Sequence, residues 1–208
     1  MSTTEPLAPP TAKGLATRNR IVSAAADLVH RYGVRGATNP AVRKAADVSG
    51  SQLSHYFPEK ERLVRAVIGW RAEQVVNFSR LPPSGRLDSL TSLRRWADSY
   101  TRREGVWRGG CRFGALASEV LKSEPDLKPE IAAGFRQWRE VFREGLVAMR
   151  ERHELSQDAD PDRLATVLLA AFQGGMLLAQ AEDSAAPLSA ALDGAIDYVA
   201  GFVTRGVG

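Results

Sequence analysis

The chain is poor in the residues that disulfide frameworks, metal centres and membrane spans require. Its 208 residues include one cysteine and three histidines, and no apolar run reaches 18 residues. A single cysteine excludes an internal disulfide and is typical of a reducing compartment. The lack of a long apolar run excludes an obvious membrane span. We therefore expect a cytoplasmic protein with no membrane partner.

Motifs of enzymes are also missing. The sequence has no Gly-rich phosphate loop, no G-x-S-x-G motif and no Cys/His spacing of a metal site, and His30, His55 and His153 are scattered. Most carboxylates fall on charged faces or in loops, so no converging set of acid, base and nucleophile can be assembled. The sequence predicts a protein that is not an enzyme and uses no cofactor or metal.

Positive charge is concentrated in the first third of the chain. Residues 1–76 contain eleven Lys and Arg against six Asp and Glu, whereas residues 77–208 contain seventeen against eighteen. A basic module joined to a near-neutral module indicates that one part meets a polyanion and the other does not. The alternative is a chance excess of solvated arginines, which charge alone does not exclude.

Apolar residues recur with the helical period of 3.6 along most of the chain. Neither a strand pattern nor an internal repeat is present, so we expect an all-α fold. Stretches rich in Gly, Pro, Ser and Asp, including LPPSG at residues 81–85, separate the helices. About nine helices are predicted, at residues 17–32, 39–46, 49–56, 58–76, 87–104, 111–122, 127–152, 161–181 and 187–204.

The stretch KAADVSGSQLSHYF, residues 44–57, contains a helix end, a tight turn and a second short helix. Upstream, Asn39 before Pro40 is a helix-start signal, because Asn caps a helix and Pro fits the first helical position. Ser49 and Gln52 have the spacing of a capping box, which begins the next helix. Two short helices joined by a tight turn have helix-turn-helix geometry, in which the second helix reads the major groove.

The exposed positions of this second helix are small or polar, which suits contacts with bases. Gln can hydrogen-bond adenine, and Ser can bond either base partner. Double-stranded DNA is therefore the expected partner, and the alternative for His55 is a solvated or core-edge histidine. The residues expected to face the groove are Gly50, Ser51, Gln52, Ser54 and His55.

From about residue 17 to 68 the chain, with IVSAAADLVHRYGVRGAT and then VRKAADVSGSQLSHYFPEKERLVRAVI, resembles the DNA-binding domain of the TetR family of bacterial regulators. The resemblance implies a dimer on a palindromic operator, repression rather than activation, and phosphate contacts by Thr38, Tyr56 and Lys60. For Tyr56 and Lys60 the alternatives are simple packing and helix-surface solvation. The predicted regions are a disordered arm at 1–16, a helix-turn-helix domain at 17–62 and a ligand-binding and dimerisation domain at 63–208.

Three departures from the TetR pattern affect the predicted reading helix. Asp47 stands where the family usually has Gly, and Asp tolerates a left-handed conformation better than most residues. Ser54 stands where the family usually has Tyr, and the segment from Thr38 to Asp47 is one residue shorter. The shorter segment bears on the position of Thr38 relative to the turn, and we expect an operator sequence that differs from those of relatives.

The larger module carries aromatic residues on helical faces. Such residues are usually core, but bundle interiors also favour apolar pockets. The stretches GGCRFGALASEV and ADPDRLATVLLAAFQGGMLLAQ resemble the ligand-binding domain of LmrA- and YxaF-like TetR repressors. That resemblance implies a small apolar or aromatic effector. The predicted lining residues are Trp96, Tyr100, Cys111, Phe113, Glu119, Trp138, Phe142, Phe172, Gln173 and Met176.

Cys111 supports a second mechanism. It follows Gly109 and Gly110 at a predicted helix start, between Arg108 and Arg112. A helix N-terminus and nearby cations both favour the thiolate, so a repressor that senses electrophiles or oxidants through Cys111 is an alternative. The other interpretation is a buried, inert thiol. A further alternative for the whole protein is ligand-independent DNA binding, for which a higher and more dispersed positive charge is expected.

The last two predicted helices, with LLAAFQGGMLLAQA and LSAALDGAIDYVAGFV, combine small and large apolar residues. An exposed face of this kind needs a partner, and a two-fold dimer suits a palindromic operator. The alternative is a core shared with the other helices of the module. The predicted homodimer residues are Leu168, Ala171, Gly175, Leu178, Leu192, Ile196, Val199 and Phe202.

Overall fold

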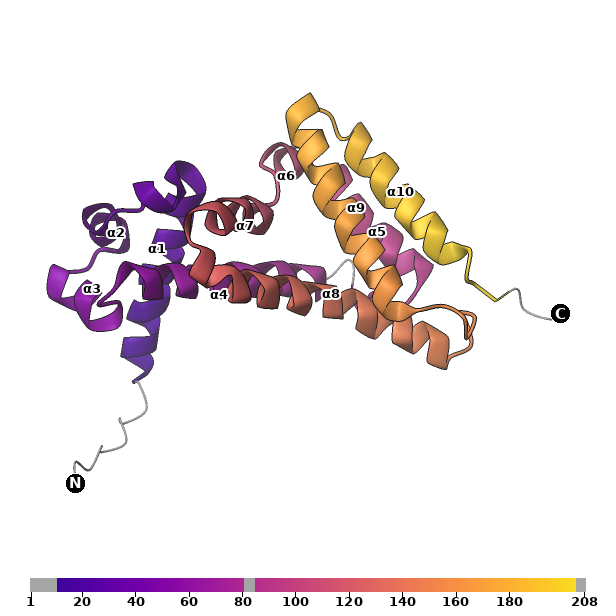
Figure 1. Cartoon of the computed structure of the whole chain (residues 1–208), viewed down its shortest axis with the longest axis horizontal. Helices are drawn as coiled ribbons and strands as arrows, with labels where there is room; N and C mark the ends of the chain where they lie inside the picture. Colours follow the sequence, from indigo (N-terminus) through magenta and orange to yellow (C-terminus); the bar gives the residue numbers. More distant parts are fainter. Residues whose placement is uncertain (1–10, 81–84, 205–208) are drawn as a thin grey trace, which may run out of the picture. The chain divides into compact units, whose positions relative to one another are not determined.

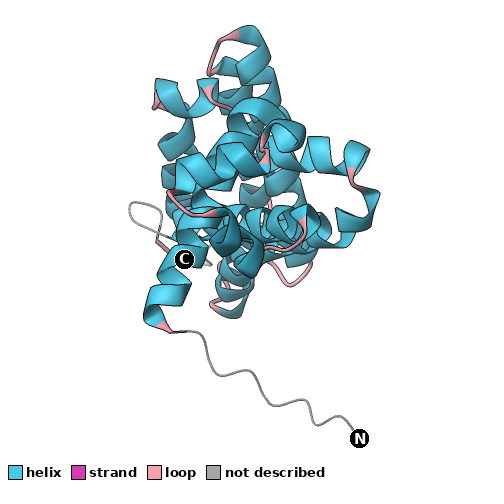
Figure 2. Ribbon diagram, turned by 90° about the vertical axis from the view of Figure 1, so that its left-hand side faces the viewer, coloured by secondary structure: helices cyan, strands magenta, loops and turns pink. Residues whose placement is uncertain are grey.

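The computed structural model describes residues 11–80 and 85–204, which form an all-α protein (Figure 1). Figure 2 shows helices and loops but no strand in these two ranges, where the only β-type pairing is an isolated bridge between Leu155 and Val203. The helices are α1 (Ala12–Gly36), α2 (Asn39–Ala46), α3 (Gly50–Tyr56), α4 (Lys60–Arg80), α5 (Leu90–Thr101), α6 (Glu104–Arg108), α7 (Arg112–Ser123), a 3₁₀ turn η1 (Pro125–Leu127), α8 (Lys128–Glu151), α9 (Pro161–Glu182) and α10 (Ala186–Ala200).

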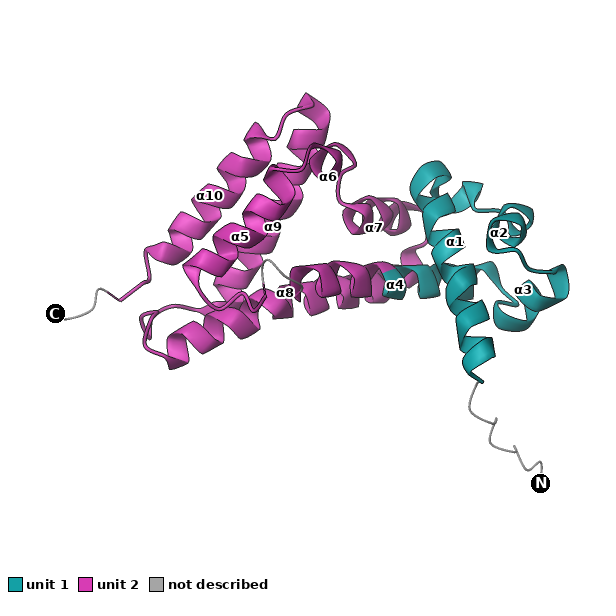
Figure 3. Ribbon diagram, turned by 180° about the vertical axis from the view of Figure 1, so that it is seen from behind, with its two compact units in different colours: residues 1–70 teal, residues 71–208 magenta. Residues whose placement is uncertain are grey.

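The chain divides into two compact units, residues 1–70 and 71–208 (Figure 3). The division falls inside α4, after Trp70, whereas the sequence placed the domain boundary after residue 62. Helix α4 thus belongs to both units.

The first helix starts earlier than predicted. The Oγ1 of Thr11 accepts a hydrogen bond from the Gly14 N–H at 3.2 Å and caps α1, so residues 12–16 are helical and not part of a disordered arm. The rest of the predicted arm, residues 1–10, lies outside the described residues, as do residues 81–84 of the predicted linker.

Gly33 interrupts the helix near the predicted stop. Its φ of 72° and ψ of 173° are not helical, and φ in this range is readily adopted only by glycine. The chain then makes one more turn to Gly36 before α2. The first unit is packed around apolar side chains that are almost fully buried: Ile21, Val22, Ala25, Val29, Val34, Val42, Ala46, Leu53, Phe57, Leu63, Val64, Val67 and Ile68.

The second unit contains the end of α4 and the helices from α5 to α10. Within it, α10 packs against both α9 and α5, while α8 packs against α9 and α7 (Figure 1). Two details differ from the sequence prediction. Helix α5 ends at Thr101 and the five-residue α6 follows it, and α10 ends at Ala200, where Gly201 caps it.

Candidate nucleic-acid interface and effector pockets

The short helix α3 is held by the predicted capping box. The Ser49 Oγ accepts a hydrogen bond from the Gln52 backbone N–H at 3.1 Å, and the Gln52 Oε1 accepts one from the Ser49 backbone N–H at 2.9 Å. Two N–H groups that a helix start leaves without intrahelical partners are therefore satisfied by the helix itself. A seven-residue helix gains little from its own backbone, so this cap and the burial of Leu53 stabilise it.

The turn between α2 and α3 depends on Asp47. Its φ of 49° and ψ of 60° are left-handed, which confirms the conformation expected from the sequence. The Val48 N–H donates to the Arg43 carbonyl at 3.1 Å and closes the turn. From the first helix, Arg20 Nε donates to the Ala46 carbonyl at 2.8 Å, so the C-terminal end of α2 has a cationic partner.

Helix α2 begins one residue away from the predicted register. Thr38, not Asn39, is the N-cap residue: its Oγ1 accepts a hydrogen bond from the Ala41 N–H at 3.4 Å. Asn39 and Pro40 occupy the first two helical positions. Both Thr and Asn are good caps, so the choice depends on where the chain leaves α1. The Thr38 hydroxyl is exposed but is already used by the helix.

The structure places the predicted groove-facing residues on one accessible surface. Ser51, Gln52, Ser54 and His55 are exposed, and Gly50 is half-buried. The His55 ring meets the half-buried Tyr56 ring edge-on, with centroids 5.0 Å apart. Lys60, at the first position of α4, is exposed. Within the first unit, the first turn of α3 therefore presents hydroxyl and amide groups around a helix N-terminus.

Capping limits what Gln52 can offer to a base. Because its Oε1 accepts from the Ser49 backbone, only the Nε2 amide group is left as a donor. The bidentate contact to adenine, which needs both ends of the amide, would require the cap to open. Ser54 and His55 have no such engagement with the backbone in the described ranges and are the freer polar groups.

Arg43 also belongs to this surface, although it was not among the residues predicted from the sequence. A Cβ built on Gly50 would lie 3.4 Å from the Arg43 guanidinium, so this exposed side chain lies beside the first residue of α3. An arginine there adds positive charge next to the α3 N-terminus, which suits a phosphate contact. The sequence did place Arg43 in the basic part of the chain. Only the geometry of the turn shows that this arginine, and not another one, lies beside the start of α3.

In the second unit, the predicted aromatic lining residues pack on one another. The Phe172 ring lies 5.3 Å from Trp96, 4.6 Å from Tyr100 and 5.1 Å from Trp138, measured between centroids. Trp96 also meets Phe142 at 4.9 Å. These distances are typical of favourable aromatic pairs, and all five residues are buried. The structure thus brings these five residues together as a cluster in which every ring has at least one aromatic neighbour.

Polar groups are buried inside this aromatic cluster. The Trp138 Nε1 donates to the Ser79 Oγ at 3.1 Å, and Ser79 in turn donates to the Val75 carbonyl. Burial raises the pKa of Tyr100 far above its usual value, so its hydroxyl is neutral at physiological pH. The cluster therefore offers neutral donors and acceptors and no ionised group.

Three other predicted lining residues border a pocket of about 510 Å³ between α7 and α9: Cys111, Gln173 and Met176. Cys111 caps α7, since its Sγ accepts from the Gly114 N–H at 3.2 Å, and it also accepts from Gln173 Nε2 at 3.5 Å. Burial raises the Cys111 pKa, and this outweighs the hydrogen bonds, which lower it. Glu119 is half-buried on α7 and Phe113 is fully buried.

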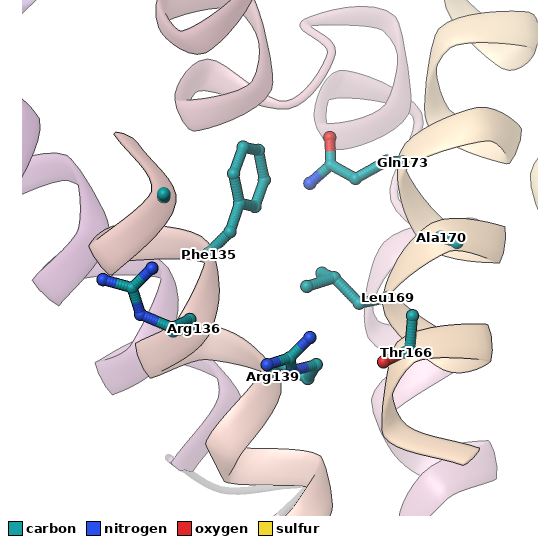
Figure 4. A pocket seen from close by; sticks show the side chains of 8 residues that line it. Phe135, Arg136, Arg139, Thr166, Leu169, Ala170 and Gln173 are labelled. Atoms are coloured by element: carbon teal, nitrogen blue, oxygen red, sulfur yellow. The ribbon is translucent and has the colours of Figure 1, made fainter. Parts of the chain in front are cut away.

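A second depression, which we call the α8/α9 groove, lies next to this pocket and shares Gln173 with it (Figure 4). Its volume is about 490 Å³, within the usual range for small-molecule sites. Of its residues, only Gln173 was predicted from the sequence, because the groove forms only when the faces of two consecutive helices, α8 and α9, pack together. The lining residues are Ala132, Phe135, Arg136, Arg139, Thr166, Leu169, Ala170 and Gln173.

Comparison with known proteins agrees with this architecture. Residues 86–195, more than half of the chain, match the family described as "Tetracyclin repressor-like, C-terminal domain", and residues 21–67 match "Bacterial regulatory proteins, tetR family". The chain belongs to the TetR family. It is therefore a helix-turn-helix transcriptional regulator and not an enzyme.

Individual relatives of this TetR protein are regulators as well. The transcriptional regulator AcuR of Cereibacter sphaeroides is 30% identical over 158 residues, which cover 71% of this chain and 68% of AcuR. The HTH-type transcriptional repressor DhaR of Mycobacterium sp. (strain GP1) is 24% identical over 82% of this chain and 86% of DhaR. A TetR regulator from Chloroflexus aurantiacus has a similar structure, with 27% identity, a TM-score of 0.75 and coverage of 93% and 98% of the two chains.

The residues predicted for dimerisation of this TetR protein fall into two groups. Leu168, Leu192, Ile196 and Val199 are buried within the chain, where α9 packs on α10. Gly175 is buried too, because a Cβ there would lie 3.0 Å from atoms of Leu188 and Ala191. Leu178 is 51% exposed, and Ala171 and Phe202 are half-buried.

The accessible apolar face of α9 includes residues that sequence analysis missed. Leu177 is 67% exposed beside Leu178, and Tyr198 on α10 is exposed as well. By length and composition α9 could cross a membrane, but 44% of its most apolar stretch is buried inside the unit, as in core helices of soluble proteins. The exposed apolar residues Leu177, Leu178 and Tyr198 form what we call the exposed strip of α9 and α10. Uncovered apolar surface of this kind is typical of protein interfaces.

Proposed function

We propose that this TetR protein is a cytoplasmic, homodimeric repressor that binds a palindromic operator and is released by a small effector. The observation that carries the proposal is the capped helix α3, whose polar residues are exposed in a basic unit, in a chain that also contains a second unit with small-molecule-sized pockets. The first unit supplies DNA binding, and the second supplies dimerisation and effector binding.

The operator contacts proposed are of two kinds. Ser51, Ser54, His55 and the Nε2 of Gln52 face base edges, with Gly50 at the point of closest approach. Phosphates are contacted by Thr38, Arg43, Tyr56 and Lys60, which position the helix without reading sequence. Because Ser54 is small, its neighbour His55 supplies the largest exposed side chain of α3.

The proposed dimer interface is the exposed strip of α9 and α10. Leu177, Leu178 and Tyr198 supply apolar area, while Gly174 and Gly194 have no side chain within 4 Å of a Cβ position and would allow a second helix to approach closely. The buried Leu168, Leu192, Ile196 and Val199 support this face from behind. A Leu177→Glu variant is expected to be monomeric by sedimentation, whereas Leu121→Glu, on an exposed residue of α7, is expected to remain dimeric.

Effector binding is proposed to act through α4, because this helix is part of both units. A two-fold dimer must present its recognition helices about 34–36 Å apart, one turn of DNA. An effector that changes this spacing lowers operator affinity, and thermodynamic linkage requires that operator DNA lowers effector affinity by the same factor. Equal effector affinity with and without operator would contradict this coupling.

The proposal is tested by selecting DNA bound by the full-length protein from a random pool. We expect a palindromic sequence, bound as a dimer in fluorescence anisotropy. Changing His55 to Ala is expected to weaken binding to that sequence by about 1–3 kcal/mol and to relax preference at one position of each half-site. Selection of no common sequence would favour ligand-independent, non-specific DNA binding instead.

A second candidate mechanism is thiol sensing by Cys111. It is favoured by the position of Sγ at the α7 N-terminus, where it accepts two hydrogen bonds, and by the adjoining pocket. It is opposed by burial, which raises the pKa of this thiol and reduces the thiolate fraction at neutral pH. If operator release by an electrophile such as N-ethylmaleimide is unchanged in Cys111→Ser, the thiol is not the sensor.

The effector is proposed to be small and at least partly apolar, as the α7/α9 pocket and the α8/α9 groove both combine apolar side chains with a few polar groups. The likeness to LmrA- and YxaF-like repressors stays a prediction from sequence. Fluorescence titration with apolar aromatic compounds, with and without operator, distinguishes an effector-released repressor from a ligand-independent one.

A further inference from the structure

The α8/α9 groove has an unbalanced positive charge. Arg139 is half-buried, and Arg136 is exposed further out on the same helix. In the described parts of the chain, neither guanidinium has a carboxylate partner. The nearby acids Glu140 and Asp162 are paired with another arginine. Arg143 donates from Nη1 to Glu140 Oε1 at 3.0 Å and from Nε to Asp162 Oδ2 at 3.1 Å.

This contrast separates Arg136 and Arg139 from the other two arginines of α8. Arg150 donates to the Ala159 carbonyl at 3.3 Å, and Arg143 has two carboxylates. A half-buried guanidinium loses part of its hydration, so an anion beside it is favoured more than at a fully exposed arginine. The groove contains no Asp or Glu that could supply this anion from within.

Opposite the charge, the groove is apolar. Figure 4 shows Phe135 and Leu169 projecting into the space between α8 and α9, with Arg139 at one end and Gln173 at the other. Ala132 and Ala170 widen the walls between them. A molecule that fits this arrangement has an apolar body and an anionic group at one end, and a second polar atom would meet the Gln173 amide.

We propose that the α8/α9 groove binds a small carboxylate, with its anionic group on Arg139 and its apolar body between Phe135 and Leu169. The planar guanidinium fork matches a carboxylate through two parallel hydrogen bonds. Arg136 adds to the positive potential at the rim. As an assignment of the effector class this rests on the function proposed above, but carboxylate binding by the groove is independent of it.

The test uses the full-length protein with phenylacetate, its neutral analogue phenylacetamide, and phenyl phosphate, measured by calorimetry and by NMR of the arginine Nε–H groups. We expect phenylacetate to bind more tightly than the amide and to shift the Arg139 signal. Arg139→Gln is expected to weaken phenylacetate binding by about 10-fold to 100-fold and to leave phenylacetamide unchanged. Arg95→Gln, an exposed arginine on α5, is the matched control and should change neither.

Several outcomes would overturn the assignment. Equal binding of phenylacetate and phenylacetamide would show that the groove has no anion-binding site. Tighter binding of phenyl phosphate than of phenylacetate would show that the ligand class is phosphates and not carboxylates. A shift from dimer to monomer in Arg139→Gln by sedimentation, without loss of phenylacetate binding, would show that Arg139 pairs with a second copy of the chain. Operator binding is measured separately, so a protein that binds phenylacetate but no DNA would contradict only the proposed function.

Discussion

The recognition helix α3 and the aromatic cluster of the second unit are stabilised in opposite ways. The atoms that hold α3 in place are close in sequence: Ser49 bonds Gln52, and Asp47 turns the chain two residues earlier. The cluster joins Trp96, Trp138 and Phe172, which come from three different helices. Local capping leaves α3 side chains free for a partner, whereas long-range packing uses up the surfaces of the aromatic rings.

The largest loss of stability is expected for a substitution at the centre of the aromatic cluster. Phe172→Ala removes a ring that meets Trp96, Tyr100 and Trp138, and is expected to lower the free energy of unfolding by about 3–5 kcal/mol. Urea denaturation followed by tryptophan fluorescence measures it. Phe78→Ala is the control, because this residue is 37% exposed. An equal loss in both variants would show that the cluster is not the centre of stability.

A smaller loss of stability is expected at Gly145, where α8 lies against the backbone of another segment. A Cβ on Gly145 of α8 would overlap the Leu87 carbonyl, so Gly145→Ala must push α8 away from the segment before α5. We expect a loss of about 1–3 kcal/mol in the same denaturation experiment. Gly69→Ala in α4 has open space around the new methyl group and should instead be slightly stabilising. Similar effects at both glycines would contradict the close approach.

Removing the α3 cap tests the local side of the comparison. Ser49→Ala deletes the acceptor of the Gln52 N–H and is expected to cost about 1 kcal/mol of stability. Ser54→Ala, on the exposed face of the same helix, should leave stability unchanged while altering operator affinity. Loss of stability in Ser54→Ala alone would mean that the exposed face, and not the cap, holds α3.

The smallest change in stability is expected at the turn between α2 and α3. Asp47→Gly relieves a left-handed conformation with φ of 49° and is expected to raise stability by only about 0.5 kcal/mol, because the greater entropy of glycine in the unfolded chain offsets part of the gain. Asp47→Val should lower stability, because a β-branched residue disfavours this conformation. Thermal denaturation of the two variants beside the parent protein gives the sign, and a gain with Val would refute the conformational argument.

Features that depend on neighbouring residues were predictable. The Ser49–Gln52 box, the interruption at Gly33 and the left-handed Asp47 all follow from the conformational preferences of residues a few positions apart. The error at α2 was of the same local kind, because Thr38 and Asn39 are both competent caps and only the path of the chain after α1 selects Thr38. The five-residue α6 was missed because its apolar pattern is too short to show a period.

Features that depend on which faces meet were not predictable. The sequence marks Leu192 and Leu178 alike as apolar, yet the first is buried under α9 and the second is 51% exposed. Periodicity identifies an apolar stripe but does not say what covers it. The same limit applies to the four arginines of α8, which are indistinguishable in sequence although, among the described residues, only Arg143 has carboxylate partners.

The sequence by itself determined the helical fold, the helix-turn-helix with its caps, and the resemblance to TetR regulators, because these depend on residue types at short, regular spacings. Only the tertiary structure decided that the Gln52 oxygen accepts a hydrogen bond within its own helix cap and that the aromatic residues pack on one another. It also decided that Arg139 faces an apolar groove with no carboxylate partner among the residues described. The physical reason is that burial and charge balance depend on helix packing, which brings together residues from α8 and α9 that no local pattern connects.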